Sequence, residues 1–236
     1  MAQPKIVAIH QPNFFPWLGY FNKIARANLF IFLDNVQFPK TGGTWMNRVQ
    51  LLVDGKPDWV TMPLMRAYQG TRRVNEILIN NTLNWQSKFL KTIATNYGRA
   101  PYFREIYSTI ESLISHATVK LVDFNTAVLG TLIERLRLDH CAFIMASSLE
   151  VEGKATDMLI EMVRRVEGTT YLCGGGAFAY QEDEKFAAAE IDLQFQKFIH
   201  PVYPQHNTRE FVMGLSIIDA LMNCGFYGAR QLINRE

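Results

Sequence analysis

Short apolar runs that stop at polar residues recur along the chain. The run KIVAI at residues 5–9 stops at His10, and the run LFIFL at residues 29–33 stops at Asp34. Between them, apolar side chains recur at helical spacing over residues 18–27. A buried strand, a short helix and a second buried strand in this order predict a βαβ unit with parallel strands and a right-handed crossover.

The later pattern adds a hairpin, several helices and three more strands. Apolar runs at residues 45–53 and 59–64 flank Asp54-Gly55, a strong hairpin signal. Helices are predicted over 84–97, 102–115, 121–138, 154–166, 177–190 and 210–223, the last stopped by Gly225, and strands over 143–146, 170–172 and 193–198. We therefore expect an α/β fold in one domain, residues 1–236: a mostly parallel Rossmann-like sheet flanked by helices, with an inserted hairpin (about 44–65) and a helical subdomain (about 84–138).

Composition and charge exclude several classes of protein. A chain that is 48% hydrophobic with a net charge of +2 is not intrinsically disordered, and its small basic excess argues against a nucleic-acid partner bound by charge alone. No apolar run approaches the ~20 residues of a membrane span, and the N-terminus lacks the apolar region of a signal peptide. The three scattered cysteines form no C-x-x-C pair. We expect a cytoplasmic protein without a transmembrane segment.

Polar residues follow three of the predicted strands, where open α/β sheets bind their ligands. These residues are His10-Gln11, Asp34-Asn35 with Gln37, and Ser147-Ser148. The stretch 10–20 also gathers aromatic residues and two prolines, which suit the wall of a small-molecule pocket. His10 is a candidate catalytic or ligand-binding residue, and the alternative is a hydrogen-bonded structural histidine. The tryptophans Trp45, Trp59 and Trp85 are expected to be core or wall residues.

Two glycine-containing segments could hold an anion. Lys40 and Arg48 flank Gly42-Gly43, and their charges with free backbone N–H groups would suit a phosphate. The alternative there is a mobile loop before an edge strand. Gly174 and Gly175 follow a predicted strand and precede a helix, so their amides could cradle a phosphate or simply form a tight turn. Cys173 before them is more readily a buried thiol than a nucleophile.

The segment HPVYPQH, residues 200–206, follows the last predicted strand. No carboxylate or cysteine stands at a normal ligand offset from its two histidines, so no metal site is predicted. His200 is instead a candidate general base or hydrogen-bonding residue. Asp219 lies within an apolar helical pattern, and a buried aspartate there needs a partner from the protein or from a substrate.

Longer motifs resemble those of a known family, the WbqC-like proteins. Residues 9–48 contain H-Q-P, P-W-x-G-Y-F-x-K-I, L-D-x-V-Q-F and W-x-N-R, in that order. The similarity continues through SSLEVEGKATDMLIEMV, YLCGGGAFAY, HPVYPQ and FVMGLSIIDALMNCG, so it covers nearly the whole chain. Ala27-Asn28 stands where Ala-Asp is usual, and Cys173 stands where serine is usual. The second departure weakens a thiol mechanism further.

The resemblance implies a role in O-antigen or other surface-polysaccharide biosynthesis, where glycyl transfer onto an amino sugar has been suggested. The matching positions are His10, Gln11, Trp17, Tyr20, Lys23, Asp34, Gln37, Lys40, Trp45, Asn47, Arg48, Ser148, Thr156, His200, Tyr203, Gln205 and Asp219. We take His10, Asp34 and His200 as the candidate catalytic residues. The candidate substrate-binding residues are Gln11, Trp17, Tyr20, Lys23, Gln37, Lys40, Trp45, Asn47, Arg48, Ser148, Gly174, Gly175, Tyr203 and Gln205.

These observations lead to the hypothesis of an N-acyl or aminoacyl transferase that acts on a nucleotide-linked amino sugar. His10, oriented by Asp34, would be the general base. Lys40 and Arg48 would hold the diphosphate, and Trp17, Tyr20 and Trp45 would stack on base or sugar. Backbone amides near Gly175 could stabilise an oxyanion.

Two alternatives stay open. The segment from the strand at residues 5–9, through the loop ending in Pro16-Trp17-Leu18-Gly19-Tyr20 and the helix, to the strand ending at Asp34 also resembles the half-fold of class I nucleotidyltransferases and synthetases, which suggests nucleotidyl or adenylyl transfer. The histidines of that group's H-x-G-H loop are absent here, so the topology can be shared without the chemistry. The other alternative is a non-catalytic sugar-binding protein. The sugar, the acyl donor, any cofactor and homo-oligomerisation are left open.

Overall fold

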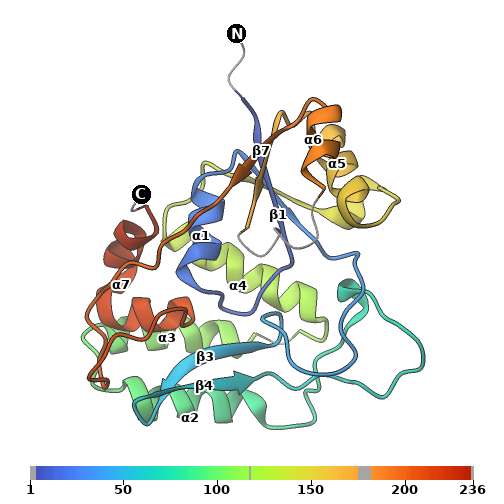
Figure 1. Ribbon diagram of the computed structural model, residues 1–236. Coiled ribbons are helices and arrows are strands. Elements are labelled where there is room, and N and C mark those ends of the chain that lie inside the picture. Colours follow the sequence, from blue (N-terminus) through green and yellow to red (C-terminus); the bar gives the residue numbers. More distant parts are fainter. Residues whose placement is uncertain (1–3, 117, 175–181, 235–236) are drawn as a thin grey trace.

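Five parallel strands form the central sheet, in the order β5-β2-β1-β6-β7 (Figure 1). They are β1 (Ile6–His10), β2 (Leu29–Phe32), β5 (Ala142–Met145), β6 (Thr170–Cys173) and β7 (Asp192–Phe195). The computed structural model describes residues 4–116, 118–174 and 182–234. The predicted α/β class with a parallel sheet is confirmed, and the predicted strands match within a few residues.

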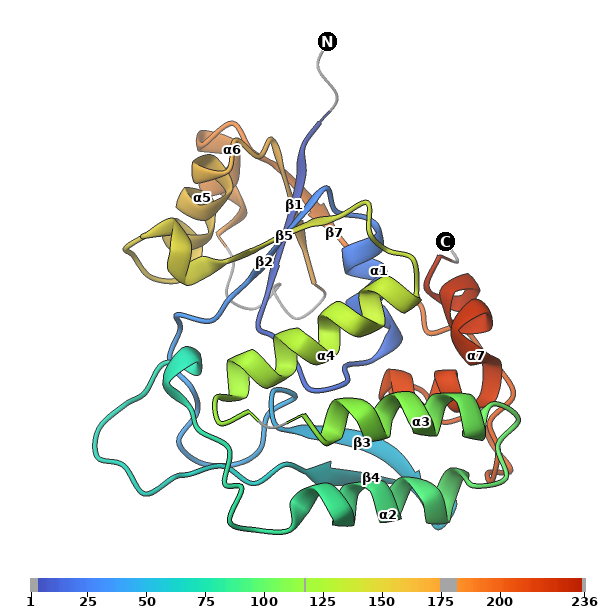
Figure 2. The ribbon, with the colours of Figure 1, turned by 180° about the vertical axis from the view of Figure 1, so that it is seen from behind.

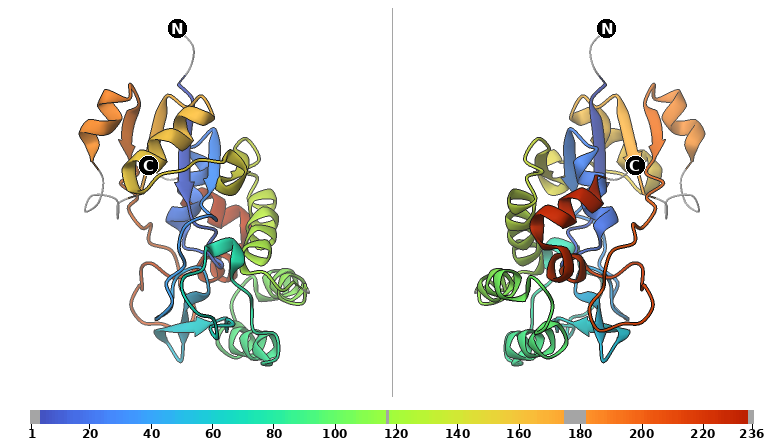
Figure 3. Two further views of the ribbon diagram at one scale, coloured as in Figure 1. Left: turned by 90° about the vertical axis from the view of Figure 1, so that its right-hand side faces the viewer. Right: turned by 90° about the vertical axis from the view of Figure 1, so that its left-hand side faces the viewer.

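Alternate side chains of the strands enter two separate cores. On β1, Ala8 packs into one core, while Val7 and Ile9 pack into the other. The first core is covered by α1 (Leu18–Ala25) and α4 (Leu121–Arg135), with α7 (Ile217–Ile233) packed beyond α1; the second is covered by α5 (Ala155–Arg165) and α6 (Asp183–Ala188) (Figure 3). Because both faces are covered at the centre of the sheet, β1 and β2 are short apolar runs, whereas the edge strand β7 alternates polar and apolar residues.

The inserted segment adds the hairpin β3 (Arg48–Val53) and β4 (Lys56–Thr61) beyond the carboxyl end of β1. Strand β3 packs against α7 and against α2 (Trp85–Tyr97), and α2 in turn packs against α3 (Phe103–Ile114), which lies beside it in Figure 2. At the hairpin turn, Asp54 and Gly55 have φ of 50° and 75°, the left-handed conformation that a tight two-residue turn needs. The predicted hairpin is confirmed. Short helices η1 (Val74–Glu76) and η2 (Ala146–Leu149) complete the elements.

The last helix differs from its prediction at its start. It begins after Ser216, whose hydroxyl accepts from the backbone N–H of Ile218, and not at residue 210. Gly225 stands where the stop was predicted: with a φ of 66° its backbone is not helical, and it separates the first helical segment of α7 from a second one that the sequence did not predict. A Cβ atom at this position would lie 2.8 Å from the ring of Tyr102, so the glycine serves a close approach. The apolar side chains beyond Gly225 stay buried and sustain the second segment.

None of the described helices is both long and apolar enough to cross a membrane. The predicted helix over residues 177–190 corresponds to α6 in its second half. Its first residues fall within 175–181, which lie outside the described part of the chain.

Candidate functional site

The order of the strands reverses between β1 and β6. From β1 the chain moves outward to β2 and β5, and it then returns to β6 and β7 on the other side. Open α/β sheets bind ligands outside the carboxyl ends of the strands at such a switch point. Here these ends are His10 on β1 and Cys173-Gly174 on β6. The topology therefore directs attention to one place on the molecule.

His10 lies at this place with its ring against two aromatic side chains. The ring centroids of Tyr20 and Trp17 are 4.9 Å and 5.9 Å from that of His10, both edge-on. The Nδ1 atom lies 3.1 Å from the carbonyl oxygen of Gln11. Because a carbonyl oxygen can only accept, Nδ1 carries the proton and Nε2 presents its lone pair. Burial and the neighbouring charge of Lys23 lower the pKa of His10 to about 3, so the imidazole is neutral.

Lys23 of α1 brings a cation to the same place. Its side chain is buried, and Nζ donates to the carbonyl oxygen of Ile9, 2.9 Å away. The ammonium also faces the end of β6, since a Cβ atom built on Gly174 would lie 4.0 Å from Nζ. Burial lowers the pKa of Lys23 to about 8, against an opposing effect of Cys173. The switch point thus combines a neutral imidazole with an ammonium group.

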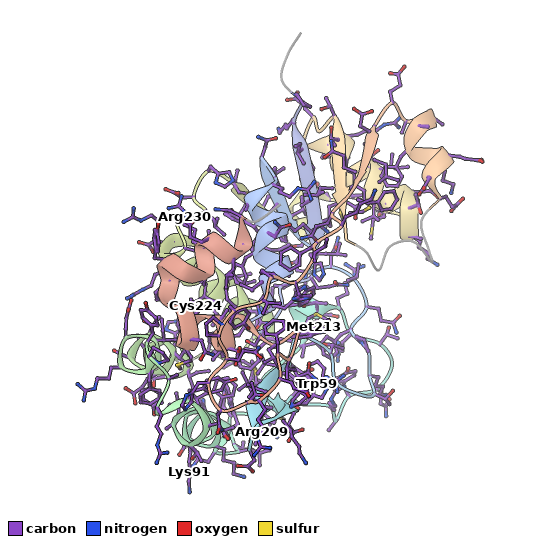
Figure 4. The ribbon with its side chains drawn as sticks, turned by 60° about the vertical axis from the view of Figure 1, so that its left-hand side comes forward. Trp59, Lys91, Arg209, Met213, Cys224 and Arg230 are labelled. Carbon is purple, nitrogen blue, oxygen red and sulfur yellow. The ribbon has the colours of Figure 1, made fainter. Side chains whose placement is uncertain are left out.

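A line of tryptophans leads from His10 to Arg48. The ring centroids of Trp17 and Trp45 are 4.9 Å apart, as are those of Trp45 and Trp59. The guanidinium of Arg48 lies 4.1 Å from the ring centroid of Trp59. Trp59 itself is labelled in Figure 4, on the hairpin. The three tryptophans and Arg48 are half-buried, so one side of this row of side chains is accessible to a ligand. We call this row the tryptophan wall. Sequence reasoning did not connect Trp59 with Arg48, because the contact depends on the pairing of β3 with β4.

Asn125 of α4 holds the two loops of this wall together. Its amide nitrogen donates to the carbonyl oxygens of Pro12 and Met46, each 2.8 Å away. The backbone N–H of Phe14 also donates to the carbonyl oxygen of Trp45 over 2.8 Å. Sequence reasoning missed Asn125, although a fully buried amide within an apolar helical pattern was a signal that could have found it.

The loop after β1 is also tied to α7. The hydroxyl of Ser216 donates to the carbonyl oxygen of Phe15 over 2.6 Å. Phe15 has a φ of 40°, a left-handed conformation that costs on the order of 1–3 kcal/mol for such a side chain. The surrounding hydrogen bonds hold this strained backbone a few residues from His10.

Asp34 does not orient His10, and that prediction is wrong. Its carboxylate accepts from the backbone N–H and the hydroxyl of Ser147, at 2.8 Å and 2.7 Å, and from the amide of Asn75 at 3.3 Å. These bonds join the end of β2 to the end of β5, on the side away from β6. The carbonyl of Gln11 takes the orienting role instead. Ser148 is exposed and donates to the carbonyl oxygen of Met145.

The described contacts of three other candidates from the 37–48 segment do not involve His10. Lys40 is exposed, with Nζ 5.5 Å from the ring centroid of Tyr68. Gln37 is exposed and forms an isolated backbone bridge with Arg73. Asn47 is buried, where it accepts from the N–H of Thr44 and donates to the carbonyl of Met62.

The candidates near the C-terminus gather around Asp219. The hydroxyl of Tyr203 donates to Oδ2 over 2.7 Å, the amide of Gln205 to the same oxygen over 3.0 Å, and the hydroxyl of Tyr97 to Oδ1 over 3.0 Å. Burial raises the pKa of Asp219. His200 lies outside this cluster with its ring 5.1 Å from that of Phe198, and burial lowers its pKa. The cluster links α7, α2 and the segment after β7.

Gly175 lies outside the described residues, whereas Gly174 is described and half-buried. In the described part of the chain, no three histidine, cysteine, aspartate or glutamate side chains come together as metal ligands would.

Comparison with known proteins extends these observations. The model of the WbqC-like protein family matches residues 11–231. An uncharacterized protein of Mycobacterium tuberculosis, Rv1507c, is 29% identical over 231 residues, which cover 94% of each chain. No solved structure matches the chain. The match spans the loop after β1, Lys23, the hairpin and the Asp219 cluster, and so the chain belongs to the WbqC-like protein family.

Proposed function

We propose that this protein is a transferase that moves an acyl or aminoacyl group, such as glycyl, onto the amine of a nucleotide-linked amino sugar for O-antigen or other surface-polysaccharide biosynthesis. The observation that carries the proposal is the position of His10 at the switch point of the sheet, with Nδ1 3.1 Å from the carbonyl oxygen of Gln11, a contact that assigns the proton to Nδ1 and leaves Nε2 as the acceptor. A neutral amine must lose a proton when it attacks an acyl carbon, and an imidazole lone pair can accept that proton.

The reaction needs few groups from the protein. The amine nitrogen attacks the carbonyl carbon of the donor, the bond to the donor's leaving group breaks, and the amine proton passes to Nε2 of His10. His10 then returns the proton to the leaving group or to water. The carbonyl of Gln11 keeps the proton of the resting imidazole on Nδ1 throughout.

The tryptophan wall supports a ligand that carries a ring beside its reactive amine. Trp17 contacts His10, and the wall continues through Trp45 to Trp59 and Arg48. A sugar or base packed on this wall would leave the amine near His10, while the guanidinium of Arg48 could bond a polar group at the far end. Arg48 thus keeps a binding role, whereas Lys40 contacts a different ring.

The proposal is tested by incubating the protein with dTDP-linked amino sugars and candidate acyl or glycyl donors, followed by mass spectrometry. Transfer adds the mass of the acyl group to the sugar nucleotide. His10→Gln should abolish transfer, and His140→Gln serves as the matched control, since His140 also contacts a backbone carbonyl but lies at the surface. No mass gain with any donor, or full transfer by His10→Gln, would contradict the proposal.

A second candidate, nucleotidyl or adenylyl transfer, is favoured by one observation. The strand order about β1 and β6 is that of sheets that bind nucleotides at their switch point. This reaction requires Mg²⁺-dependent binding of a nucleoside triphosphate and release of pyrophosphate. Calorimetry with ATP and Mg²⁺ separates the two candidates, because acyl transfer onto a sugar nucleotide does not require either one.

A further inference from the structure

Within the described part of the chain, the buried ammonium group of Lys23 has no hydrogen bond or ion pair with a carboxylate. Its side chain is 3% exposed, and its one hydrogen bond among the described residues goes to a neutral backbone carbonyl, that of Ile9. The described ion pairs instead lie at the surface and involve Arg72, Arg165 and Lys185. Proteins rarely bury a charge that is not compensated, because the loss of hydration is costly.

The segment that follows Gly174 in the sequence has no acidic side chain to pair with Lys23. Residues 175–181 read GGAFAYQ and contain no aspartate or glutamate. Two groups on the neighbouring strands interact electrostatically with Lys23: the neutral imidazole of His10, and Cys173, a weak acid whose negative charge, when ionised, raises the pKa of Lys23. An ammonium group has three donors, and the contact with Ile9 uses one of them.

We propose that Lys23 is the phosphate-binding residue of this site, and that its ammonium group bonds the phosphate of a nucleoside diphosphate across the ends of β1 and β6. This inference rests on the proposed function for the identity of the nucleotide, but not for the reaction. A Cβ atom built on Gly174 would lie 4.0 Å from Nζ, so the ammonium group lies beside the carboxyl end of β6, at the switch point of the sheet, where open α/β sheets bind their ligands.

Phosphate binding here would also act on His10. The charge of Lys23 is one of the two causes that lower the pKa of His10. An anion bound to the ammonium compensates that charge, and the imidazole becomes a better proton acceptor. The nucleotide would therefore prepare the base as it binds, which couples binding of the phosphate to the chemical step.

The test uses calorimetric titration of the full chain with dTDP, with pyrophosphate and with thymidine, which has no phosphate. We expect dTDP and pyrophosphate to bind and thymidine to bind at least tenfold more weakly than dTDP. Lys23→Met should weaken dTDP at least tenfold and leave thymidine unchanged. Arg26→Met is the matched control, because it removes an equal charge from an exposed residue just past the end of α1.

Three results would overturn the inference: unchanged dTDP affinity in Lys23→Met, an equal loss in Arg26→Met, or no binding of dTDP and pyrophosphate to the unmodified protein. Circular dichroism and the melting temperature establish that Lys23→Met is folded. If the protein binds dTDP through Lys23 but transfers no acyl group, the inference stands and the proposed function fails.

Discussion

The hydroxyl of Tyr20 and the imidazole of His10 share one acceptor, the carbonyl oxygen of Gln11. Tyr20 donates to it over 2.9 Å, and Nδ1 of His10 lies 3.1 Å from it, while the two rings meet edge-on. One backbone carbonyl thus sets both the tautomer and the orientation of the imidazole. Burial raises the pKa of Tyr20, so its hydroxyl remains a donor.

This shared acceptor predicts the effect of Tyr20→Phe. The change removes one hydrogen bond and leaves the other in place, so the free energy of unfolding should fall by about 1 kcal/mol. Transfer should slow several-fold without being lost, in contrast to His10→Gln. Urea denaturation and initial rates measure the two effects. Complete loss of transfer in a folded Tyr20→Phe protein would mean that the hydroxyl itself takes part in the reaction.

His10 also predicts how stability depends on acid. Its pKa is about 3 in the folded protein and 6.5 in the unfolded chain, so the unfolded state binds more protons between these values. The contribution of His10 to stability is therefore complete above pH 6.5 and is lost as the pH falls toward 3. His10→Gln should flatten the fall of the urea midpoint over this range. Parallel curves for the two proteins would show that His10 titrates normally.

Lys23 predicts a variant that gains stability while it loses binding. Its pKa falls from 10.5 to about 8 on folding, so the unfolded state binds more protons between these values, and stability is lost as the pH decreases from 10.5 to 8. The cost is complete below pH 8 and amounts to about 3 kcal/mol. Lys23→Met removes it but leaves the carbonyl of Ile9 without a donor, at a cost of about 1 kcal/mol.

We therefore expect Lys23→Met to raise the free energy of unfolding by about 2 kcal/mol at pH 7, from these two opposing terms. The gain should shrink as the pH approaches 10.5. The charges of His10 and Cys173 also change with pH and interact with the ammonium group of Lys23. The free energy of unfolding of the variant is therefore compared with that of the parent at the same pH. A variant that is less stable than the parent at pH 7 would indicate a structural role for the ammonium group.

Asn125 predicts a large effect from a residue that has no role in the proposed chemistry. Asn125→Leu leaves the buried carbonyls of Pro12 and Met46 without their donor, which should cost about 2–5 kcal/mol in stability. Transfer should fall as well, because the loop after β1 is freed from the segment before β3. Thr126→Ala, at the next position of α4, should change stability by less than about 0.5 kcal/mol. Equal melting temperatures for both variants would contradict the proposal that Asn125 holds the two loops together.

The Asp219 cluster predicts that Tyr203 is structural. Tyr203→Phe removes the hydrogen bond to a buried carboxylate and should lower stability by about 1.5–3 kcal/mol, with dTDP affinity unchanged. Thermal denaturation and calorimetry check both parts. Weaker dTDP binding at unchanged stability would contradict a purely structural role. It would support the substrate-binding role that the family positions of Tyr203 and Gln205 imply.

Local pattern predicted most elements of this protein because their signals lie within a few residues. The buried strands β1 and β2, the hairpin at Asp54-Gly55 and the helices of the inserted segment all follow from apolar spacing and turn residues. The last helix was predicted to begin too early, and the helical segment after Gly225 was not predicted, since a glycine that interrupts a helix does not show whether a second helix follows. The ring of Tyr102, far away in the chain, is what Gly225 accommodates.

The sequence by itself determined the α/β class and the family, and it placed a histidine and several aromatic residues in the loop after β1. Only the tertiary structure decided the partners. It paired Asp34 with Ser147, placed Tyr203 on Asp219, and brought Lys23 to the end of β6. The physical reason is that a polar side chain chooses among donors and acceptors distant in sequence, and strand order determines which are within reach.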